Sequence, residues 1–289
     1  MINREVFNEF YEKNIVDFEK EYEQITIEYE NMKKDLKNFL IWSGIIIMFT
    51  LLIAFFSCSF VLFVVWSLIT ICMVFLFIKR ENDVQNIEQR KNESRNKILK
   101  PLFEKFFEDY YRDAKISSST KVVEDSKIWN SSAQIVLGEV YRRNERDFII
   151  MNMGRKISYS EGMWIEFDGL FASYEISENI QDIIYIKNGK KRKKKNKTFN
   201  TIFNVRSENK NTLNKIITKD FKEKLLMLYE FIYERDIIIS IYKNKIYIAM
   251  NGVKLFQGKE FFNGNVNSSV VYEYLINLEI LLKQIKELI

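Results

Sequence analysis

The chain has 289 residues and a formal net charge of +5, from 44 Lys and Arg against 39 Asp and Glu; it has no histidine and two cysteines. Without histidine, one chain cannot form a Ser-His-Asp triad, a Cys-His pair or a histidine-containing metal site. Glycine-rich nucleotide-binding patterns are missing as well, so we expect no metal, no cofactor and no catalytic residue, and we favour a non-enzymatic protein.

The first 38 residues carry a seam of apolar side chains whose spacing alternates between four and three residues. The seam consists of Tyr11, Ile15, Phe18, Tyr22, Ile25, Tyr29, Met32, Leu36 and Phe39. This heptad pattern predicts a helix that continues into the next segment and needs a partner. The partner is either a later helix of the same chain, which we favour, or a second copy in a homodimer. Because the first residues are charged, no cleaved signal peptide is expected.

Residues 39–78 contain no Asp, Glu, Lys or Arg. One transmembrane helix needs ~20 apolar residues, and this run is long enough for two. Its hydrophobicity falls at Ser57-Cys58-Ser59. The sequence therefore predicts a transmembrane helical hairpin with spans at about 39–56 and 60–78.

Cationic residues stand at both ends of the apolar run and none stands at its central turn. Lys33, Lys34 and Lys37 precede the run, and Lys79 and Arg80 follow it. Positive charges near span ends favour the cytoplasmic side. We therefore expect a multi-pass protein of a bacterial plasma (inner) membrane with both termini in the cytoplasm; the bacterial source is inferred from the abundance of Lys, Asn, Ile, Tyr and Phe.

Residues 79–120 are predicted to form a cytoplasmic helical arm. A patchy apolar stripe supports it: Val84, Ile87, Ile98, Leu102, Phe106 and Tyr110. Proline disfavours helical geometry in the residue before it and is well tolerated in a first helical turn. We therefore expect a kink or a new helix start at Pro101.

Residues 121–289 show a different texture, in which short alternating segments are mixed with helical ones. Helices are predicted at 126–137, at 219–233 and from Ser268 or Ser269 onward. Strands are predicted at 147–154, 156–160, 163–176, 182–186, 201–207, 237–242 and 245–250, the last two forming a hairpin at Lys243-Asn244. This order predicts an α+β domain with a mostly antiparallel sheet and flanking helices.

Several charged and aromatic side chains of this domain are candidates for an active site. Glu161, Glu166, Asp168 and Glu175 could act as acid and base or hold a cation, and Glu166 and Asp168 should share one face of a strand. The wet face of a strand explains them equally well, and we prefer that interpretation. The cluster of Arg142, Arg143, Glu145, Arg146 and Asp147 is interpreted as a solvated turn. Trp129 and Trp164 are interpreted as core or strand aromatics.

Residues 187–197 form a very basic loop. Its cations are Lys187, Lys190, Lys191, Arg192, Lys193, Lys194, Lys195 and Lys197. Such density predicts a disordered segment. It is either a solvated insertion without a partner or a site for the anionic membrane surface, since basic residues near anionic lipid contribute ~1 kcal/mol each. Nucleic acid is the weakest reading, because no aromatic side chain is interleaved for base stacking.

Three stretches resemble one bacterial family. They are Ile157-Ser158-Tyr159-Ser160-Glu161, Phe167-Asp168-Gly169-Leu170-Phe171, and the block from Thr218 to Leu226 that leads to Lys245-Ile246-Tyr247-Ile248-Ala249 and Leu255-Phe256. With the preceding apolar hairpin they resemble the domain of unknown function 3137 from about Lys79 onward. The resemblance implies a membrane-anchored bacterial protein with a cytoplasmic domain and no established activity. It supplies no catalytic residue, and the basic loop departs from it.

The sequence thus favours a membrane-anchored cytoplasmic module that binds a partner protein or the anionic membrane surface. One alternative is an enzyme that acts on a lipid or envelope precursor at the inner leaflet, which needs carboxylates clustered in a groove. A weaker alternative is a membrane-attached RNA- or nucleoid-binding protein.

Overall fold

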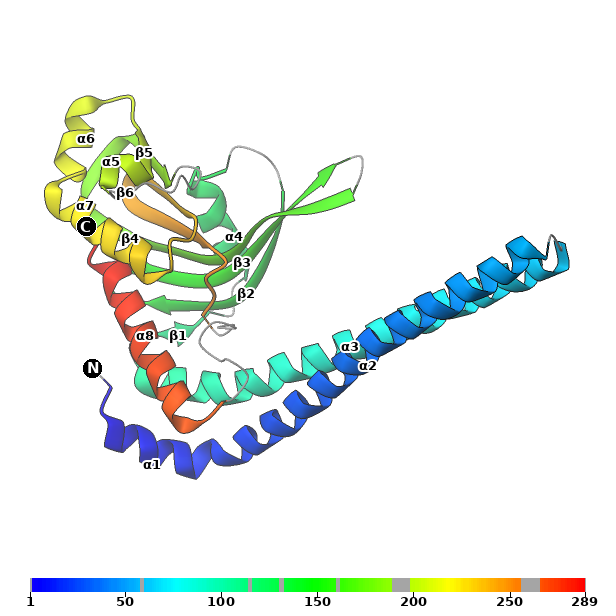
Figure 1. Cartoon of the computed structure of the whole chain (residues 1–289). Helices are drawn as coiled ribbons and strands as arrows, with labels where there is room; N and C mark the ends of the chain where they lie inside the picture. Colours follow the sequence, from blue (N-terminus) through cyan, green and yellow to red (C-terminus); the bar gives the residue numbers. More distant parts are fainter. Residues whose placement is uncertain are drawn as a thin grey trace. The chain divides into compact units, whose positions relative to one another are not determined.

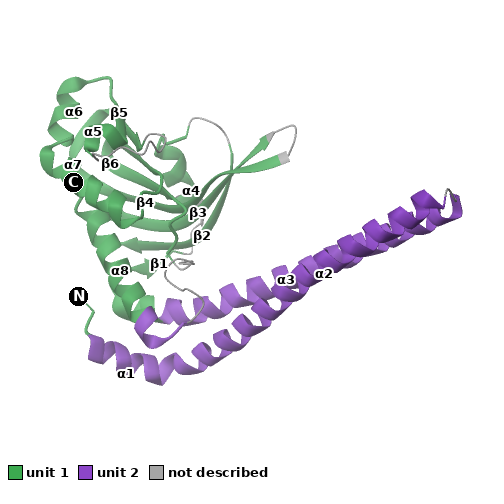
Figure 2. Ribbon diagram, in the orientation of Figure 1, with its two compact units in different colours: residues 1–3, 102–261, 271–289 green, residues 4–101, 262–270 purple. Residues whose placement is uncertain are grey.

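The computed structural model describes residues 2–57, 60–113, 116–129, 133–159, 162–188, 198–255 and 266–288. The chain divides into two compact units (Figure 2). Unit 1 comprises Met1–Asn3, Leu102–Phe261 and Val271–Ile289, and unit 2 comprises Arg4–Pro101 and Phe262–Val270. The elements of each unit are described separately.

Unit 2 is built from α1 (Arg4–Asn14), α2 (Val16–Phe56) and most of α3 (Phe60–Phe106). α2 and α3 have 41 and 47 residues and run antiparallel, side by side (Figure 1). α2 ends and α3 begins at the residues where the sequence placed the turn. Cys58 and Ser59, in that turn, lie outside the described residues.

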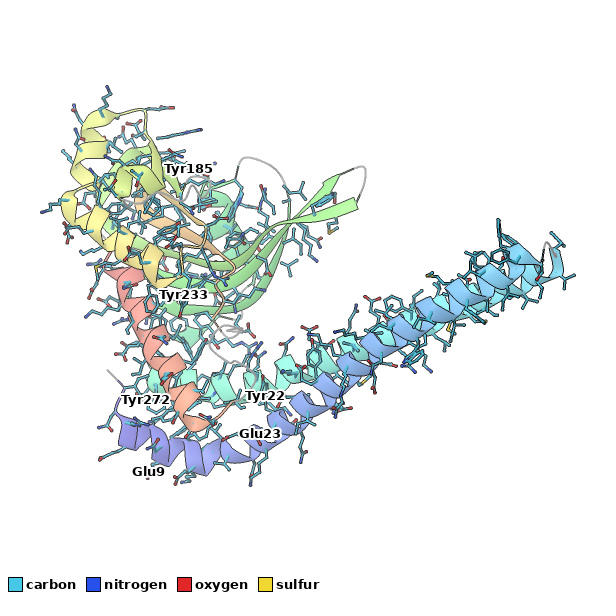
Figure 3. All side chains as sticks on the ribbon, viewed as in Figure 1. Glu9, Tyr22, Glu23, Tyr185, Tyr233 and Tyr272 are labelled. Carbon is cyan, nitrogen blue, oxygen red and sulfur yellow. The ribbon has the colours of Figure 1, made fainter. Side chains whose placement is uncertain are left out.

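The N-terminal seam faces α3 of the same chain. All nine seam residues are buried or half-buried, whereas most of their neighbours are exposed. Lys97 forms an ion pair with Glu21 at 2.7 Å, and the ammonium of Lys91 lies 5.6 Å from the ring centre of Tyr22, the α2 residue labelled in Figure 3. The intramolecular pairing that the sequence favoured is therefore present.

Of the two expectations at Pro101, a kink or a new helix start, the new start is not found, because α3 runs through this residue. Proline removes one helical hydrogen bond and crowds the preceding turn. The residues on both sides, Ile98, Leu99, Leu102 and Phe103, are fully buried. Their burial keeps the helix continuous despite the local cost of the proline.

Unit 1 contains a six-stranded sheet in which every pair is antiparallel. Its strands are β1 (Tyr111–Arg112), β2 (Gln134–Arg143), β3 (Phe148–Tyr159), β4 (Gly162–Asn188), β5 (Phe203–Arg206) and β6 (Ile237–Asn251). They are ordered β1-β2-β3-β4-β5, and β6 also pairs with β4. β4 has 27 residues and is hydrogen-bonded to three other strands.

Both faces of the sheet are covered. The remaining helical elements are α4 (Ile116–Asp125), η1 (Glu145–Asp147), α5 (Phe199–Ile202), α6 (Lys210–Ile216), α7 (Lys219–Phe231) and α8 (Ser268–Lys286). One face forms a core with Val123 of α4, Met151 of β3 and Phe171 of β4. On the other face, the ring of Phe103, near the end of α3, lies 4.5 Å from that of Tyr141. The predicted α+β class with an antiparallel sheet is confirmed.

Two local predictions were wrong. Of the residues predicted as a helix at 126–137, those that the structure describes are not helical: α4 ends at Asp125, and β2 begins at Gln134 with the alternating half-buried positions of a strand. Residues 237–250 form one strand within β6 and not a hairpin. Lys243 takes φ 56° where the pairing of β6 with β4 shifts register, and this irregularity is a bulge. The last helix, α8, begins at Ser268, as predicted, and the Oδ1 of Asn267 before it accepts from the Val270 N–H at 3.0 Å.

Candidate functional site

α2 and α3 expose a large apolar surface. Phe55, Phe56 and Phe60 are 74%, 80% and 82% exposed. Both helices are long and apolar enough to cross a membrane, and almost none of their most apolar stretches is buried. A core helix of a soluble protein would hide such side chains, and the apolar surface is therefore a candidate for contact with lipid.

The polar side chains of this apolar region bond to the backbone of its helices. Between residues 39 and 78, every serine and threonine hydroxyl that the structure describes donates to a carbonyl three or four residues earlier. The donors are Ser43, Thr50, Ser57, Ser67 and Thr70. Such bonds satisfy the hydroxyls without water, as a hydrocarbon surrounding requires.

Two contacts join the apolar helices to each other. The indole N–H of Trp66 donates to the Ile47 carbonyl oxygen at 3.1 Å. At the charged end of the hairpin, the guanidinium of Arg80 lies 4.5 Å from the ring centre of Phe39. The first contact explains a tryptophan in mid-span that sequence reasoning did not place, since a hydrogen bond across helices is not visible in a hydrophobicity pattern.

Of the predicted basic site, the structure describes Lys187. Lys187 is exposed near the end of β4, where its Cα is paired with those of Asn204 and Ile238. The other cations, Lys190, Lys191, Arg192, Lys193, Lys194, Lys195 and Lys197, lie outside the described residues.

The predicted acidic residues do not converge. Glu166 forms an ion pair with Arg155, Asp168 with Lys254 at 2.6 Å, and Glu175 with Lys245 at 3.8 Å. Glu161 lies outside the described residues. Within the part of the chain that the structure describes, no three Asp, Glu or Cys side chains group as metal ligands. Glu166 and Asp168 each face a separate cation.

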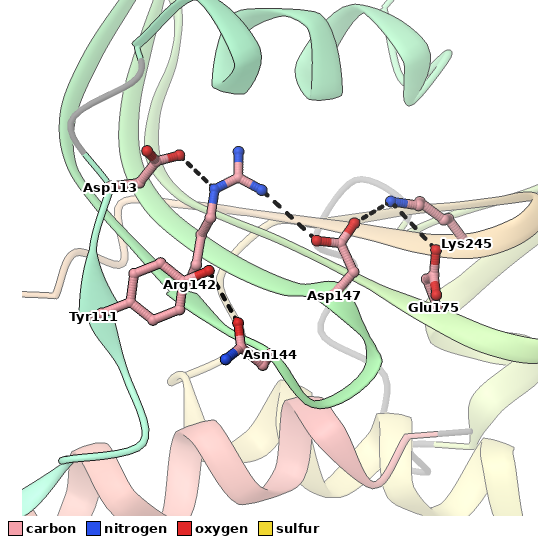
Figure 4. A network of polar contacts seen from close by, with 7 residues as sticks. All are labelled: Tyr111, Asp113, Arg142, Asn144, Asp147, Glu175 and Lys245. Carbon is pink, nitrogen blue, oxygen red and sulfur yellow. Dashed lines mark hydrogen bonds and ion pairs between the residues drawn. The ribbon is translucent and has the colours of Figure 1, made fainter.

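The charged cluster lies in a turn at η1, where Glu145 and Arg146 are exposed, and two of its members, Arg142 and Asp147, belong to a network of ion pairs (Figure 4). Arg142 bonds to Asp113 and lies 3.7 Å from Asp147. Asp147 in turn binds Lys245, which also reaches Glu175. This series of ion pairs links β2 and η1 to β6. Strand β6 places Lys245 beside the turn. The sequence did not predict this contact, because Lys245 is far from the turn along the chain.

A cavity of about 380 Å³ lies beside this turn. It is lined by Glu145, Arg146, Phe148, Tyr174, Lys224, Lys286 and Glu287. Burial, with nearby Arg143, lowers the pKa of Lys286, and its ammonium lies 3.8 Å from Glu145. Lys224 is bound by Asp220 at 2.7 Å. Because charges of both signs line the cavity and oppose one another, its chemistry selects no ligand class.

The two tryptophans of unit 1 have different surroundings. Trp129 packs with its ring centre 5.3 Å from that of Phe167 and 5.4 Å from the guanidinium of Arg155, and is therefore a core aromatic, as predicted. Trp164 is a strand residue, as predicted, and it is 60% exposed. Periodicity had indicated the strand without its exposure.

Comparison with known proteins gives one family and one solved structure. The family described as "Protein of unknown function (DUF3137)" matches residues 165–289. The crystal structure of the mycobacterial trehalose monomycolate transport factor A, TtfA, is 11% identical; the match covers 60% of this chain and 88% of that one, with a TM-score of 0.30. A likeness this low carries no argument about fold or function. No curated protein matches the chain.

The family match begins inside β4 and includes β5, β6, α7 and α8. It contains the Phe167–Phe171 and Thr218–Phe256 stretches that carried the resemblance, while Ile157–Glu161 precedes it. The resemblance seen in the sequence is thereby confirmed over residues 165–289, which match the model of this family of unknown function.

Proposed function

We propose that this protein is a membrane-anchored module. The apolar parts of α2 and α3 cross the inner membrane of a bacterium as a helical hairpin, and both termini lie in the cytoplasm. The α+β unit is a binding module for a partner protein or for the anionic lipid surface. The exposed apolar surface of α2 and α3 is the observation that carries this proposal.

Two further observations support the crossing. The hydroxyls in the apolar region bond to helix carbonyls, so hydrocarbon would leave none of the described ones unsatisfied. The antiparallel arrangement puts Lys37 and Arg80 at one end of the hairpin and leaves the other end without charge. This asymmetry favours the charged end as the cytoplasmic one.

The arms that flank the proposed crossings, one before the first and one after the second, are held together by charged and aromatic contacts. Glu21 and Glu28 of α2 pair with Lys97 and Arg90 of α3, and Lys91 lies over the ring of Tyr29 at 5.1 Å. Exposed pairs of this kind contribute only ~0.2–1 kcal/mol each. Their value here is to fix which faces of the arms meet, so that the anchor continues as a paired stalk.

Labelling of single cysteines tests the anchor and its orientation. Cys58 and Cys72 are replaced by serine, and one cysteine is introduced at Lys13, Ser57 or Lys283 in the full chain. We expect all three variants in the membrane fraction after alkaline extraction. A membrane-impermeant maleimide should label position 57 in intact cells and positions 13 and 283 only after permeabilisation. Recovery of the chain in the soluble fraction, or labelling of 13 and 283 from opposite sides, would contradict the proposal.

The role of the basic loop needs a separate measurement. The full chain is placed in nanodiscs of neutral or of anionic phospholipid, and amide hydrogen exchange is followed in residues 187–197. Attraction to anionic lipid predicts slower exchange in anionic discs, with the difference fading at high salt because salt screens the charges. Equal exchange in the two lipids would exclude the anionic lipid surface as a ligand of the loop.

A further inference from the structure

The tip of the β3–β4 hairpin extends beyond the rest of the sheet (Figure 1). The last residue of β3 that is paired with β2 is Lys156, and the pairing of β4 with β6 begins only at Gly169. Beyond Lys156 and its β4 partner Ile165, β3 and β4 are paired only with each other and form a two-stranded ribbon. A register shift between Arg155 and Lys156 marks its base, and such bulges change the direction of a strand.

The ribbon carries three consecutive exposed apolar residues. Met163, Trp164 and Ile165 are 56%, 60% and 66% exposed. Consecutive strand residues point to opposite faces, so apolar side chains are bare on both faces of the ribbon. A groove on a partner protein would cover one face, whereas a fluid surface can surround the whole tip.

The base of the ribbon is held firmly. Arg155, whose side chain is only 3% exposed, is paired with Glu166. Trp129 stacks against Arg155 and packs on Phe167 at the start of the core. The exposed tip is therefore presented by a fixed support, and ordering it on contact costs little conformational entropy.

Other runs of three or more consecutive exposed large apolar residues, within the described chain, occur only in α2 and α3. Examples are Leu40–Trp42, Phe60–Val65 and Val74–Leu76. The tip thus shares its surface chemistry with the segments proposed to lie in lipid. A module tethered to a bilayer meets that surface at high effective concentration.

We propose that the β3–β4 tip inserts Met163, Trp164 and Ile165 into the headgroup–acyl boundary of the bilayer that anchors the chain. Tryptophan is enriched at this depth because its ring is apolar and its N–H is polar. The open edges of the ribbon retain backbone donors and acceptors that hydrocarbon could not satisfy, so the insertion stops at the interface. This inference rests on the proposed membrane anchor.

The test uses the full chain in phosphatidylcholine nanodiscs, whose neutral lipid excludes a contribution from the basic loop. An environment-sensitive fluorophore is attached to a single cysteine at Met163 or, as a matched control, at Met227, which is 58% exposed on α7. A third variant is labelled at the native Cys72 of α3. Quenching is measured with aqueous iodide and with a lipid that carries a nitroxide on its headgroup.

We expect iodide quenching at position 163 to be severalfold weaker than at 227, and nitroxide-lipid quenching to be severalfold stronger. A label at 163 that is as open to iodide as the label at 227 would overturn the inference. A label at 163 shielded from both quenchers would also overturn it, because a protein surface, such as a second copy, would then cover the tip. The Cys72 label separates the two proposals, since exposure of Cys72 to iodide contradicts the anchor itself.

Discussion

The helical hairpin and the α+β unit use the same apolar residue types in opposite ways. Phe55, Phe56 and Phe60 of the hairpin point outward, whereas Phe148, Phe171 and Phe221 of the α+β unit are almost completely buried. A stretch of sequence rich in Phe and Ile therefore does not by itself indicate a core. What distinguishes the two regions is their charge pattern: charges interrupt the strands every few residues and are missing from residues 39–78. The contrast supports the proposal that the two regions lie in different solvents.

The largest expected effect comes from a substitution in the buried core of the α+β unit. Phe171→Ala should lower the free energy of unfolding of the α+β unit by about 3–5 kcal/mol, because it leaves a cavity in the core around Tyr247 and Trp129. The matched change in the hairpin, Phe55→Ala, should alter it by less than ~0.5 kcal/mol. Denaturation of the full chain in detergent micelles measures both. Similar losses in the two variants would remove the contrast.

The next largest effect comes from a charge placed on the exposed apolar surface of the helical hairpin. Val64→Arg in α3 should raise the cost of membrane insertion by ~2.5–3.5 kcal/mol and shift protein out of the membrane fraction. Val136→Arg on β2 is the control, since the two valines are 42% and 44% exposed. Arginine at Val136 faces water and should leave the membrane fraction unchanged. Equal fractionation of both variants would mean that α3 is not in lipid.

A smaller effect tests the packing of β4 against β6. A Cβ at Gly169 would collide with the Met250 carbonyl oxygen across the β4–β6 pair. Gly169→Ala should therefore cost about 1–3 kcal/mol of stability. Gly154→Ala is the control in the same sheet, because its Cβ would meet other atoms only at 3.9 Å or more. Thermal unfolding should separate the variants, and equal midpoints would show that the strands can move apart.

The smallest effect concerns alkaline pH. Burial, assisted by Asp125 and Asp147, raises the pKa of Tyr247 to about 12. Below pH ~10 the phenol is protonated in folded and unfolded chains alike. Between pH ~10 and 12 the unfolded chain ionises first, so this group makes the folded state lose stability as the pH rises. Tyr247→Phe should move the alkaline unfolding midpoint upward, as followed by circular dichroism. An unchanged or lower midpoint would contradict the assignment.

The features that could be predicted from sequence are those set by local patterns. The seam from Tyr11 to Phe39, the turn near Ser57 and the strand near Phe171 follow from residue spacing and charge alone. The long strand β4 and the bulge at Lys243 could not be found this way, because register shifts depend on the facing strand. The network around Arg142 joins residues about a hundred positions apart, from Asp147 to Lys245. No sequence window contains such a contact.

The length of β4 has a consequence for anyone who wishes to express part of this chain. The family boundary at residue 165 falls three residues into that strand. A fragment trimmed there would lack β1, β2 and β3 and would present a row of unsatisfied amide groups along its first strand. Exposed strand edges pair with strands of other molecules, so such a fragment should aggregate. A shorter version should begin upstream of Tyr111, where the sheet itself begins.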